Sequence, residues 1–388
     1  MIKRAYPLFK ESILLLGPRG VGKSTFVRAQ IKPDLEIDLL NSKSRRNLSL
    51  NPSDLEEQIA HLNPGEVVFI DEIQKIPELL DEVHRLIEKY KLKFILTGSS
   101  ARKLKNSGTN LLAGRALGFK MFPLSLYEIQ NYKIENILKF GTLPTVLVGT
   151  VAPEEYLNSY VDLYLKEEIF QESLTRNLDE FSQFTQLAAQ YHGQILNYES
   201  IARELGKSGD TVKAWFQILE DTLVGKRLKP YQAKVFVREN KHPKFYYFDP
   251  GVAWASTGQN FNEIPIEFKG FQFESIILNE IQTYFECHRK KFDIYFLSVP
   301  QVGDIDFIIQ TKKKSLSQPE KVVSLEVKAS KDWKNGFENL SMQLRHKAPK
   351  KVTRSLAVYL GTKRLTKKDV EVFPLSEFIK ELWAGKLF

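Results

Sequence analysis

The sequence of 388 residues has a single cysteine, Cys287, and only three methionines and six histidines. One cysteine excludes an internal disulfide and any zinc site built on several thiolates. The sequence also lacks an apolar run long enough to cross a bilayer, so we expect no membrane partner. These absences favour a protein of the cytoplasm.

The bulk composition is that of a globular protein with an uneven charge. Hydrophobic residues make up 43% and charged residues 27% of the chain, and the length predicts two or three domains. The net charge is +9, and residues 331–388 hold 13 Lys or Arg against 6 Asp or Glu. Such a surface suits a polyanion such as DNA, although a solvated basic face explains it equally well. The basic residues form two groups, Lys347, Lys350, Lys351 and Arg354, and then Lys363, Arg364, Lys367 and Lys368.

A glycine-rich segment follows the apolar run 13–16 and precedes a helical pattern. Its glycines let backbone N–H groups turn around a polyphosphate, and the following helix N-terminus favours negative charge. Lys23 can neutralise the β- and γ-phosphates, and the Ser24 hydroxyl can bind Mg²⁺. We interpret the segment as a phosphate-binding loop for ATP. It comprises Gly17, Pro18, Arg19, Gly20, Val21, Gly22, Lys23, Ser24 and Thr25.

A second apolar run, residues 67–70, ends in Asp71 and Glu72. A buried parallel strand delivers such acids to the carboxyl edge of its sheet, where the phosphate loop also lies. We expect Asp71 to hold Mg²⁺ and Glu72 to be the general base for the attacking water.

Other polar residues near this edge have more than one interpretation. Thr97 or Ser99 could contact the γ-phosphate or place the water, or Ser99 could cap a helix. Arg115 could stabilise the transition-state charge in its own site or in that of a neighbouring subunit, or form a surface salt bridge. Arg19, inside the phosphate loop, has the same two interpretations: it could stabilise the transition-state charge or form a surface salt bridge.

The order of elements predicts an α/β fold with a parallel sheet at the start of the chain. We expect five strands near 12–16, 35–39, 67–71, 93–97 and 118–122, with helices at 23–30, 52–61, 78–90 and 125–129. From residue 142 the pattern is mostly helical. Residues 250–268 indicate a boundary, and a second α/β region follows.

The middle of the chain contains a helix–turn–helix pattern. Residues 200–206 and 211–220 are predicted helices around a short glycine turn, and 224–229 with 234–238 could form a wing. On a DNA-binding interpretation Ser208, Thr211 and Lys213 would make contacts. A role in packing or assembly is the alternative.

The last region contains acids on two predicted strands and a helix. Asp306 lies on the strand 304–310, Glu326 and Lys328 lie on the strand 321–327 or at its end, and Glu274 lies on the helix before them. Clustered carboxylates suit Mg²⁺, and Lys328 could orient a water or stabilise phosphorane-like charge. A surface ion-pair network is the alternative.

The motifs together resemble prokaryotic AAA-type ATPases that carry a C-terminal domain of unknown function with a restriction-endonuclease-like module. They are the phosphate loop, 71–77 (DEIQKIP), 96–100 (LTGSS), 113–115 (AGR), 122–125 (FPLS) and 243–250 (PKFYYFDP). The rear acids resemble the PD-(D/E)xK nuclease motif, with Ile305 in place of its proline.

This resemblance implies three domains: an ATPase core at 1–141, a helical and winged-helix part at 142–260 and a nuclease-like domain at 261–388. It also implies a homo-oligomer with ATP sites between subunits, and it leaves the alternatives for Arg115 open. The expected function is ATP-dependent DNA binding and remodelling, with a Mg²⁺-dependent module that cuts or grips DNA. The alternative is an ATP-driven switch with an inactive nuclease fold that binds nucleic acid or a protein.

Overall fold

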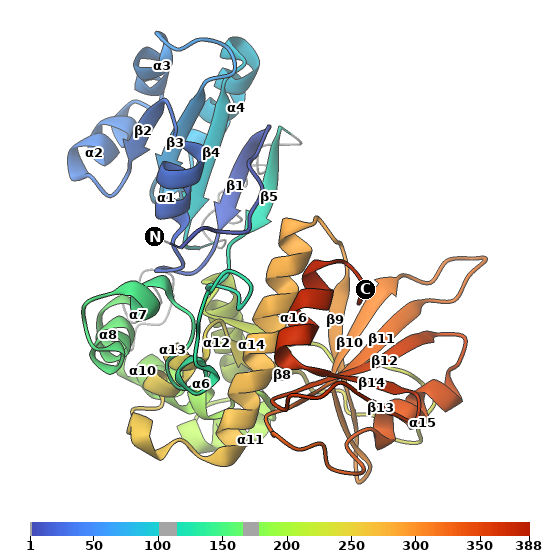
Figure 1. The fold of residues 1–388 in the computed structure, drawn as a ribbon. Helices are drawn as coiled ribbons and strands as arrows, with labels where there is room; N and C mark the ends of the chain where they lie inside the picture. Colours follow the sequence, from blue (N-terminus) through green and yellow to red (C-terminus); the bar gives the residue numbers. More distant parts are fainter. Residues whose placement is uncertain (1, 101–114, 166–177) are drawn as a thin grey trace.

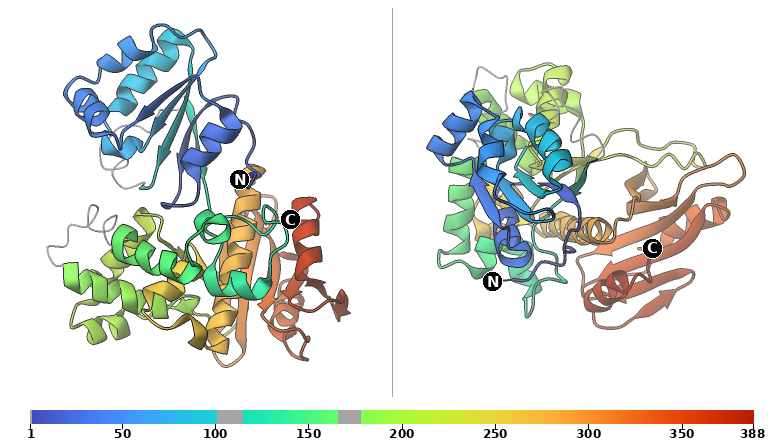
Figure 2. Two further views of the ribbon diagram at one scale, coloured as in Figure 1. Left: turned by 60° about the vertical axis from the view of Figure 1, so that its left-hand side comes forward. Right: turned by 90° about the horizontal axis from the view of Figure 1, so that it is seen from above.

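The computed structural model describes residues 2–100, 115–165 and 178–388. Its first part is a sheet with helices, its middle is mostly helical, and its last part is a second sheet with helices (Figure 1). Two further views show that the first sheet stands apart from the second and that the middle helices lie below the first (Figure 2). The predicted α/β fold class is confirmed.

The first sheet is parallel, with strand order β2-β3-β4-β1-β5. The three central strands, β3, β4 and β1, are short, mostly apolar runs, which is the pattern of strands buried on both faces, whereas the edge strands β2 and β5 are partly exposed. Its strands are β1 (Ser12–Leu16), β2 (Leu35–Asp38), β3 (Val67–Asp71), β4 (Lys93–Gly98) and β5 (Ala116–Lys120). The register pairs Leu16 with Gly98 and with Lys120, so these strands end at one edge of the sheet.

Helices cover this sheet, with some differences from the predicted ones. The elements are α1 (Lys23–Phe26), η1 (Val27–Ile31), α2 (Ser42–Leu50), α3 (Asp54–Ile59), η2 (Ile73–Lys75) and α4 (Leu79–Tyr90). The side chain of Asn41 caps α2, a helix that the sequence pattern did not predict, by accepting from two backbone N–H groups. The predicted helix at 125–129 is wrong, because these residues form a turn held by long-range hydrogen bonds.

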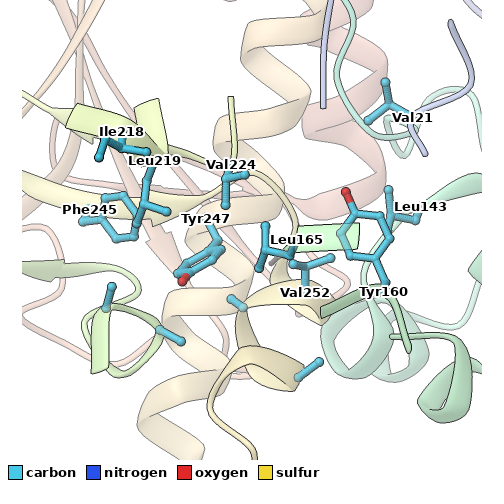
Figure 3. Close-up of a cluster of buried hydrophobic side chains, with 14 of the residues drawn as sticks. Val21, Leu143, Tyr160, Leu165, Ile218, Leu219, Val224, Phe245, Tyr247 and Val252 are labelled. Atoms are coloured by element: carbon cyan, nitrogen blue, oxygen red, sulfur yellow. The ribbon is translucent and has the colours of Figure 1, made fainter. Parts of the chain in front are cut away.

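The middle of the chain packs directly on the first sheet. It contains α6 (Ile134–Phe140), α7 (Pro144–Val148), α8 (Pro153–Ser159), η4 (Tyr160–Leu165), α10 (Leu178–Gln190), α11 (Tyr198–Leu205), α12 (Gly209–Asp221) and α13 (Pro250–Ser256). One hydrophobic cluster joins residues of both parts, among them Val21 of the phosphate loop with Leu143 and Tyr160 (Figure 3). All seven residues of α13 are buried, so the segment predicted as a boundary begins with a packed helix; the boundary itself stays a prediction.

A small antiparallel sheet of order β6-β8-β7 accompanies α11 and α12. Its strands are β6 (Gln194–Ile195), β7 (Gly225–Leu228) and β8 (Lys244–Tyr247). The predicted second wing strand at 234–238 is wrong, because those residues belong to the loop between β7 and β8. This loop lies along the last sheet: the N–H of Tyr231 donates to the carbonyl of Phe296 at 2.6 Å. Tertiary contacts with another domain therefore decide its conformation.

The last sheet has the order β13-β14-β12-β11-β10-β9. Its strands are β9 (Asp293–Val299), β10 (Gly303–Lys312), β11 (Lys321–Lys328), β12 (Val352–Tyr359), β13 (Leu365–Lys367) and β14 (Val370–Pro374). The helical elements of this region are η5 (Phe261–Glu263), α14 (Ile266–Cys287), α15 (Asn339–Lys347) and α16 (Leu375–Trp383). The long helix α14 runs between the middle helices and this sheet (Figure 1). Within the described residues, no helix combines the length and apolar character that a bilayer crossing requires.

Candidate active site

The loop between β1 and α1 has the backbone that a phosphate cradle needs. Gly20 and Gly22 have φ angles of 82° and 91°, in the left-handed region that glycine adopts without strain. A Cβ at Gly17 would lie 2.3 Å from the carbonyl oxygen of Met121. The loop therefore depends on glycine at these three positions.

The ammonium group of Lys23 lies across this loop. Its Nζ donates to the carbonyl oxygens of Gly17, at 2.7 Å, and Pro18, at 3.0 Å, and the residue is buried. A phosphate group held by the loop's backbone N–H groups would lie against the same ammonium. The positive charge is thus placed for a polyphosphate before any ligand binds.

A hydroxyl and a carboxylate meet beside the loop. The Oγ of Ser24 donates to Oδ1 of Asp71 at 2.9 Å, and the Oγ1 of Thr97 donates to the same oxygen at 2.5 Å. Hard oxygen atoms from neighbouring elements are the ligands that Mg²⁺ prefers. The donor set fits Mg²⁺ bound together with a triphosphate, and Ser24 and Asp71 are the residues that would hold it.

Glu72 follows Asp71 in a backbone conformation with φ of 61°. A non-glycine residue rarely adopts this left-handed region, and such conformations occur often at functional sites. Gln74 donates from Nε2 to Oε2 of Glu72 and also to the Oγ of Ser99, at 2.8 Å. Ser99 in turn donates to Oε2 of Glu72 at 3.2 Å. The carboxylate that we expect to be the base is therefore held in place by an amide and a hydroxyl.

Gln74 is a site residue that the sequence analysis missed, although it lies two residues after Glu72. Gly98 leaves room for it, since a Cβ there would lie 2.8 Å from Oε1 of Gln74. Thr97 and Ser99 both lie against the acids: the hydroxyl of Thr97 contacts Asp71, and that of Ser99 contacts Glu72.

Arg4 is a second residue that the sequence analysis missed. Its guanidinium donates to the carbonyl oxygen of Val21 at 2.7 Å and to that of Phe122 at 2.8 Å. It also pairs with Glu128 at 3.0 Å, and both side chains are buried. This arginine thus ties the phosphate loop to the turn after β5. No local pattern reveals the pair, because 124 residues separate the partners.

The middle helices cover the phosphate loop from outside the sheet. The hydroxyl of Tyr160 donates to the carbonyl oxygen of Arg19 at 2.8 Å. Beside the loop is a cavity of about 260 Å³ that is mostly apolar. Ile2, Thr25, Pro144 and Val148 are among the residues that line it. A nucleobase fits such an apolar space next to the loop.

Arg115 lies at the other edge of the first sheet. It immediately precedes Ala116, which pairs with Ser12 at the start of β1, whereas the phosphate loop follows the last residue of β1. Its guanidinium donates to Oε1 of Glu88 at 2.7 Å. Within this chain, Arg115 therefore forms the surface salt bridge that was one of its two interpretations. Arg115 therefore does not reach the phosphate loop of its own chain. A role in a neighbouring subunit of a homo-oligomer stays a prediction.

The rear acids come together on two strands. β10 and β11 pair in antiparallel register, with Phe307 opposite Leu325, so Asp306 lies opposite Glu326. The Nζ of Lys328 donates to Oδ2 of Asp306 at 3.1 Å and to Oε2 of Glu326 at 3.0 Å. The lysine thus bridges the two buried carboxylates. We call Asp306, Glu326, Lys328 and Glu274 the rear cluster.

Glu274 lies on α14 beside these strands. The hydroxyl of Tyr246 donates to its Oε2 at 2.7 Å, and the buried ammonium of Lys244 is 3.8 Å from the same oxygen. Burial raises the pKa of Glu274 to about 7. The sequence analysis did not identify Lys244 or Tyr246 as neighbours of this acid.

Charges inside the rear cluster largely neutralise one another. Burial, and then the charge of Asp306, raise the pKa of Glu326, although Lys328 opposes this shift. Burial works against the ionised form of Asp306, but the ammonium groups of Lys328 and Lys244 outweigh it and lower its pKa.

The arrangement does not fit the three-carboxylate metal site that the sequence predicts. In the part of the chain that the structure describes, no three His, Cys, Asp or Glu side chains are placed to hold a metal ion. The physical reason is that Lys328 takes the acceptor positions of Asp306 and Glu326, while Glu274 accepts from Tyr246. Metal binding by Asp306, Glu326 and Glu274, and catalysis by Lys328, stay predictions.

The helix pair α11 and α12 has the predicted order, with Ser208 capping α12 through the N–H of Thr211. The exposed or half-exposed charges of α12 are mostly acidic. They are Asp210, Lys213, Glu220 and Asp221. This face is poorly suited to phosphate groups, so DNA contacts by Ser208, Thr211 and Lys213 gain no support.

Comparison with known families divides the chain into three matches. Residues 10–130 match the model of the family described as an AAA domain. Residues 131–263 and 269–378 match two domains of unknown function, DUF8612 and DUF4143. The phosphate loop and the acids Asp71 and Glu72 lie within the first match, so residues 10–130 are similar to AAA domains in both sequence and site.

Curated relatives are distant. An uncharacterized protein of Mycobacterium tuberculosis is 22% identical over 307 residues, which cover 77% of this chain and 67% of the relative. An uncharacterized protein of Haemophilus influenzae is 23% identical over 211 residues, 49% of this chain and 52% of the relative. The Holliday junction branch migration complex subunit RuvB of Staphylococcus aureus is 33% identical over 97 residues, 24% of this chain and 28% of RuvB.

Similar solved structures include a RuvB protein of Thermotoga maritima, with a TM-score of 0.29 and 16% identity over 56% of this chain and 82% of that chain. The ORC1 protein of Aeropyrum pernix in complex with DNA has a TM-score of 0.28 and 10% identity, over 65% of this chain and 87% of that chain.

Proposed function

We propose that the chain binds ATP together with Mg²⁺ and hydrolyses it at the phosphate loop. The observation that carries the proposal is the network of Lys23, Ser24, Asp71 and Glu72 at one edge of the first sheet. The match of residues 10–130 to an AAA domain supports it.

Each residue has a distinct role in this proposal. Lys23 neutralises charge on the β- and γ-phosphates, and Glu72 orients the attacking water and accepts its proton. Gln74 positions Glu72 through their hydrogen bond. Mg²⁺, when bound, would be held by Ser24 and Asp71 and would neutralise phosphate charge.

The test is steady-state ATP turnover by the Glu72→Gln variant. We expect turnover to fall about 100-fold or more, the size of a general-base contribution, while ATP affinity changes little. Glu78→Gln is the matched control, because Glu78 is an exposed acid six residues further on. Turnover at the wild-type rate in Glu72→Gln would remove Glu72 as the base.

We also propose that the C-terminal half binds DNA through the loop between β7 and β8. This loop carries the exposed residues Lys229, Lys234, Arg238 and Lys241, whose side chains make no ion pair with other described residues. Val237 at its outer side is fully exposed. Unpaired cations around an exposed apolar side chain suit a phosphate backbone.

The neighbouring helix α15 extends this basic surface. The ammonium of Lys347 lies 5.4 Å from the ring centre of Phe236 in the loop, so loop and helix adjoin. Two basic residues further along the C-terminal region are already neutralised. Lys351 pairs with Glu320 at 3.1 Å, and Arg354 pairs with Glu371 at 2.8 Å.

Binding of a labelled DNA duplex, measured by fluorescence anisotropy at several salt concentrations, tests this second proposal. The double variant Arg238→Gln/Lys241→Gln should weaken binding and lower the salt slope by roughly one to two, since each phosphate contact contributes about 0.9. Lys363→Gln/Lys368→Gln carries the same charge change elsewhere and should leave binding nearly unchanged. Equal losses in the two variants would contradict the assigned surface.

A further inference from the structure

A cavity of about 480 Å³ lies where the three parts of the chain meet. Its walls come from the ends of β1 and β5, from α12 with β7 and β8, and from α14. It is separate from the apolar cavity beside Thr25, because the two share no lining residue. Five residues carry the argument: Gly17, Pro18, Lys120, Phe122 and Lys226.

Two lysines reach this cavity without an acceptor. Lys226 of β7 is half-buried and Lys120 at the end of β5 is exposed, and neither ammonium makes a hydrogen bond or ion pair within the described chain. Burial, and then the charge of Lys120, lower the pKa of Lys226 to about 8. Two cations that repel each other at the wall of a cavity favour a bound anion.

The two acids that line this cavity have partners of their own. Glu220 accepts from the backbone N–H and the Nε of Arg227, each at 2.7 Å. Asp221 accepts from Gln217 at 3.2 Å. These carboxylates therefore leave the two ammonium groups without a direct counter-ion.

The remaining walls are largely apolar, with Leu16, Met121, Phe122, Phe248 and Leu278 among them. We propose that this cavity binds a small organic anion with an apolar body. The anionic group lies against Lys226 and Lys120, and the apolar body fills the rest of the cavity.

Occupancy of this cavity acts on the phosphate loop. Gly17 and Pro18 line it, and their carbonyl oxygens are the acceptors of Lys23. A ligand that presses on these two residues changes the position of the lysine, and hence the affinity for ATP. This second claim rests on the proposed ATPase function, whereas binding to the cavity does not.

The experiment uses two fluorescent probes of similar shape, the anion anilinonaphthalene sulfonate and the uncharged N-phenylnaphthylamine. The wild-type chain should bind the anion saturably, and Lys226→Met should weaken that binding about tenfold or more, the loss expected for one charge-assisted contact. Lys269→Met, which changes an exposed lysine of α14 that does not line the cavity, should bind like the wild type. Binding of the uncharged probe should be equal in all three proteins, which shows that the cavity is intact.

Unchanged binding of the anion in Lys226→Met, or equal weakening of both probes, would overturn the proposed site. The same titrations with Mg²⁺ and ATP present test the coupling: a saturating anionic probe should shift ATP affinity in the wild type and not in Lys226→Met. If the anionic probe binds but ATP affinity does not shift, the coupling to the ATP site is overturned and the proposed anion site stands. A chain that binds the probe but never binds ATP would contradict the proposed function and not the cavity.

Discussion

Each end of the molecule holds one buried or half-buried lysine and two carboxylates in its candidate site, and the pairings differ. In the phosphate loop, Lys23 donates to backbone carbonyl groups, while Asp71 and Glu72 accept from hydroxyl and amide groups. In the rear cluster, Lys328 donates directly to both Asp306 and Glu326. The first arrangement holds its lysine on carbonyl groups, with Asp71 3.5 Å from the exposed guanidinium of Arg28, and the second pairs lysine and carboxylates directly.

The difference shows what a binding site requires of the fold. Charges held by neutral groups keep their full electrostatic effect on a ligand, whereas charges paired with each other contribute mainly to the folded state. The front site is therefore prepared for an anion and a cation. The rear cluster, as arranged, joins β10, β11 and α14.

Replacing Lys23 and Lys328 in turn with methionine sharpens this comparison. Of the variants discussed below, Lys328→Met should change the free energy of unfolding most. Lys328→Met leaves buried carboxylates unpaired, so the free energy of unfolding should fall by about 3 kcal/mol. Lys23→Met removes hydrogen bonds to two carbonyl groups and should cost about 1 kcal/mol. Urea unfolding followed by tryptophan fluorescence measures both.

Adding Glu326→Gln to Lys328→Met should recover part of the loss, because the amide removes one of the unpaired charges. Equal destabilisation by the two lysine variants would contradict the distinction between the clusters.

The contact between the two ends gives a smaller, pH-dependent effect. Glu280 of α14 accepts from the backbone N–H of Leu126 at 2.6 Å and from the Nε1 of Trp383 at 2.6 Å. Burial raises its pKa to about 7, from 4.5. The folded state then binds a proton more tightly than the unfolded state, so stability falls as the pH rises from about 4.5 to 7.

The Glu280→Gln variant should lack this contribution, which is on the order of 2 kcal/mol. Unfolding free energies of wild type and variant at several pH values measure it, and Glu377→Gln, on the first turn of α16, is a control. Parallel curves for wild type and Glu280→Gln would show that Glu280 does not titrate in this range.

Local patterns in the sequence predicted the parts of the site that lie within single elements. The apolar runs before Gly17 and Asp71 become β1 and β3, because continuous hydrophobic residues suit strands buried on both faces. The parallel register then brings the two segments together. Pairing of Asp306 with Glu326 followed equally from the spacing of two strands.

Contacts between distant segments were not predictable in this way. Arg4 with Glu128, and Glu280 with the turn at Leu126, depend on how whole domains pack. The segment 234–238 has the alternation of a strand but becomes a loop, because the C-terminal domain offers it another partner. The bridging position of Lys328 also depends on side-chain geometry that spacing does not determine.

Calorimetric titration of Mg²⁺ and ATP into the wild type, Lys23→Met and Lys328→Met tests the central claim most directly. The account predicts that Lys23→Met weakens binding by about 100-fold or more, because it removes charge-assisted contacts to the phosphates, and that folded Lys328→Met binds as the wild type does. Wild-type affinity in Lys23→Met would contradict it.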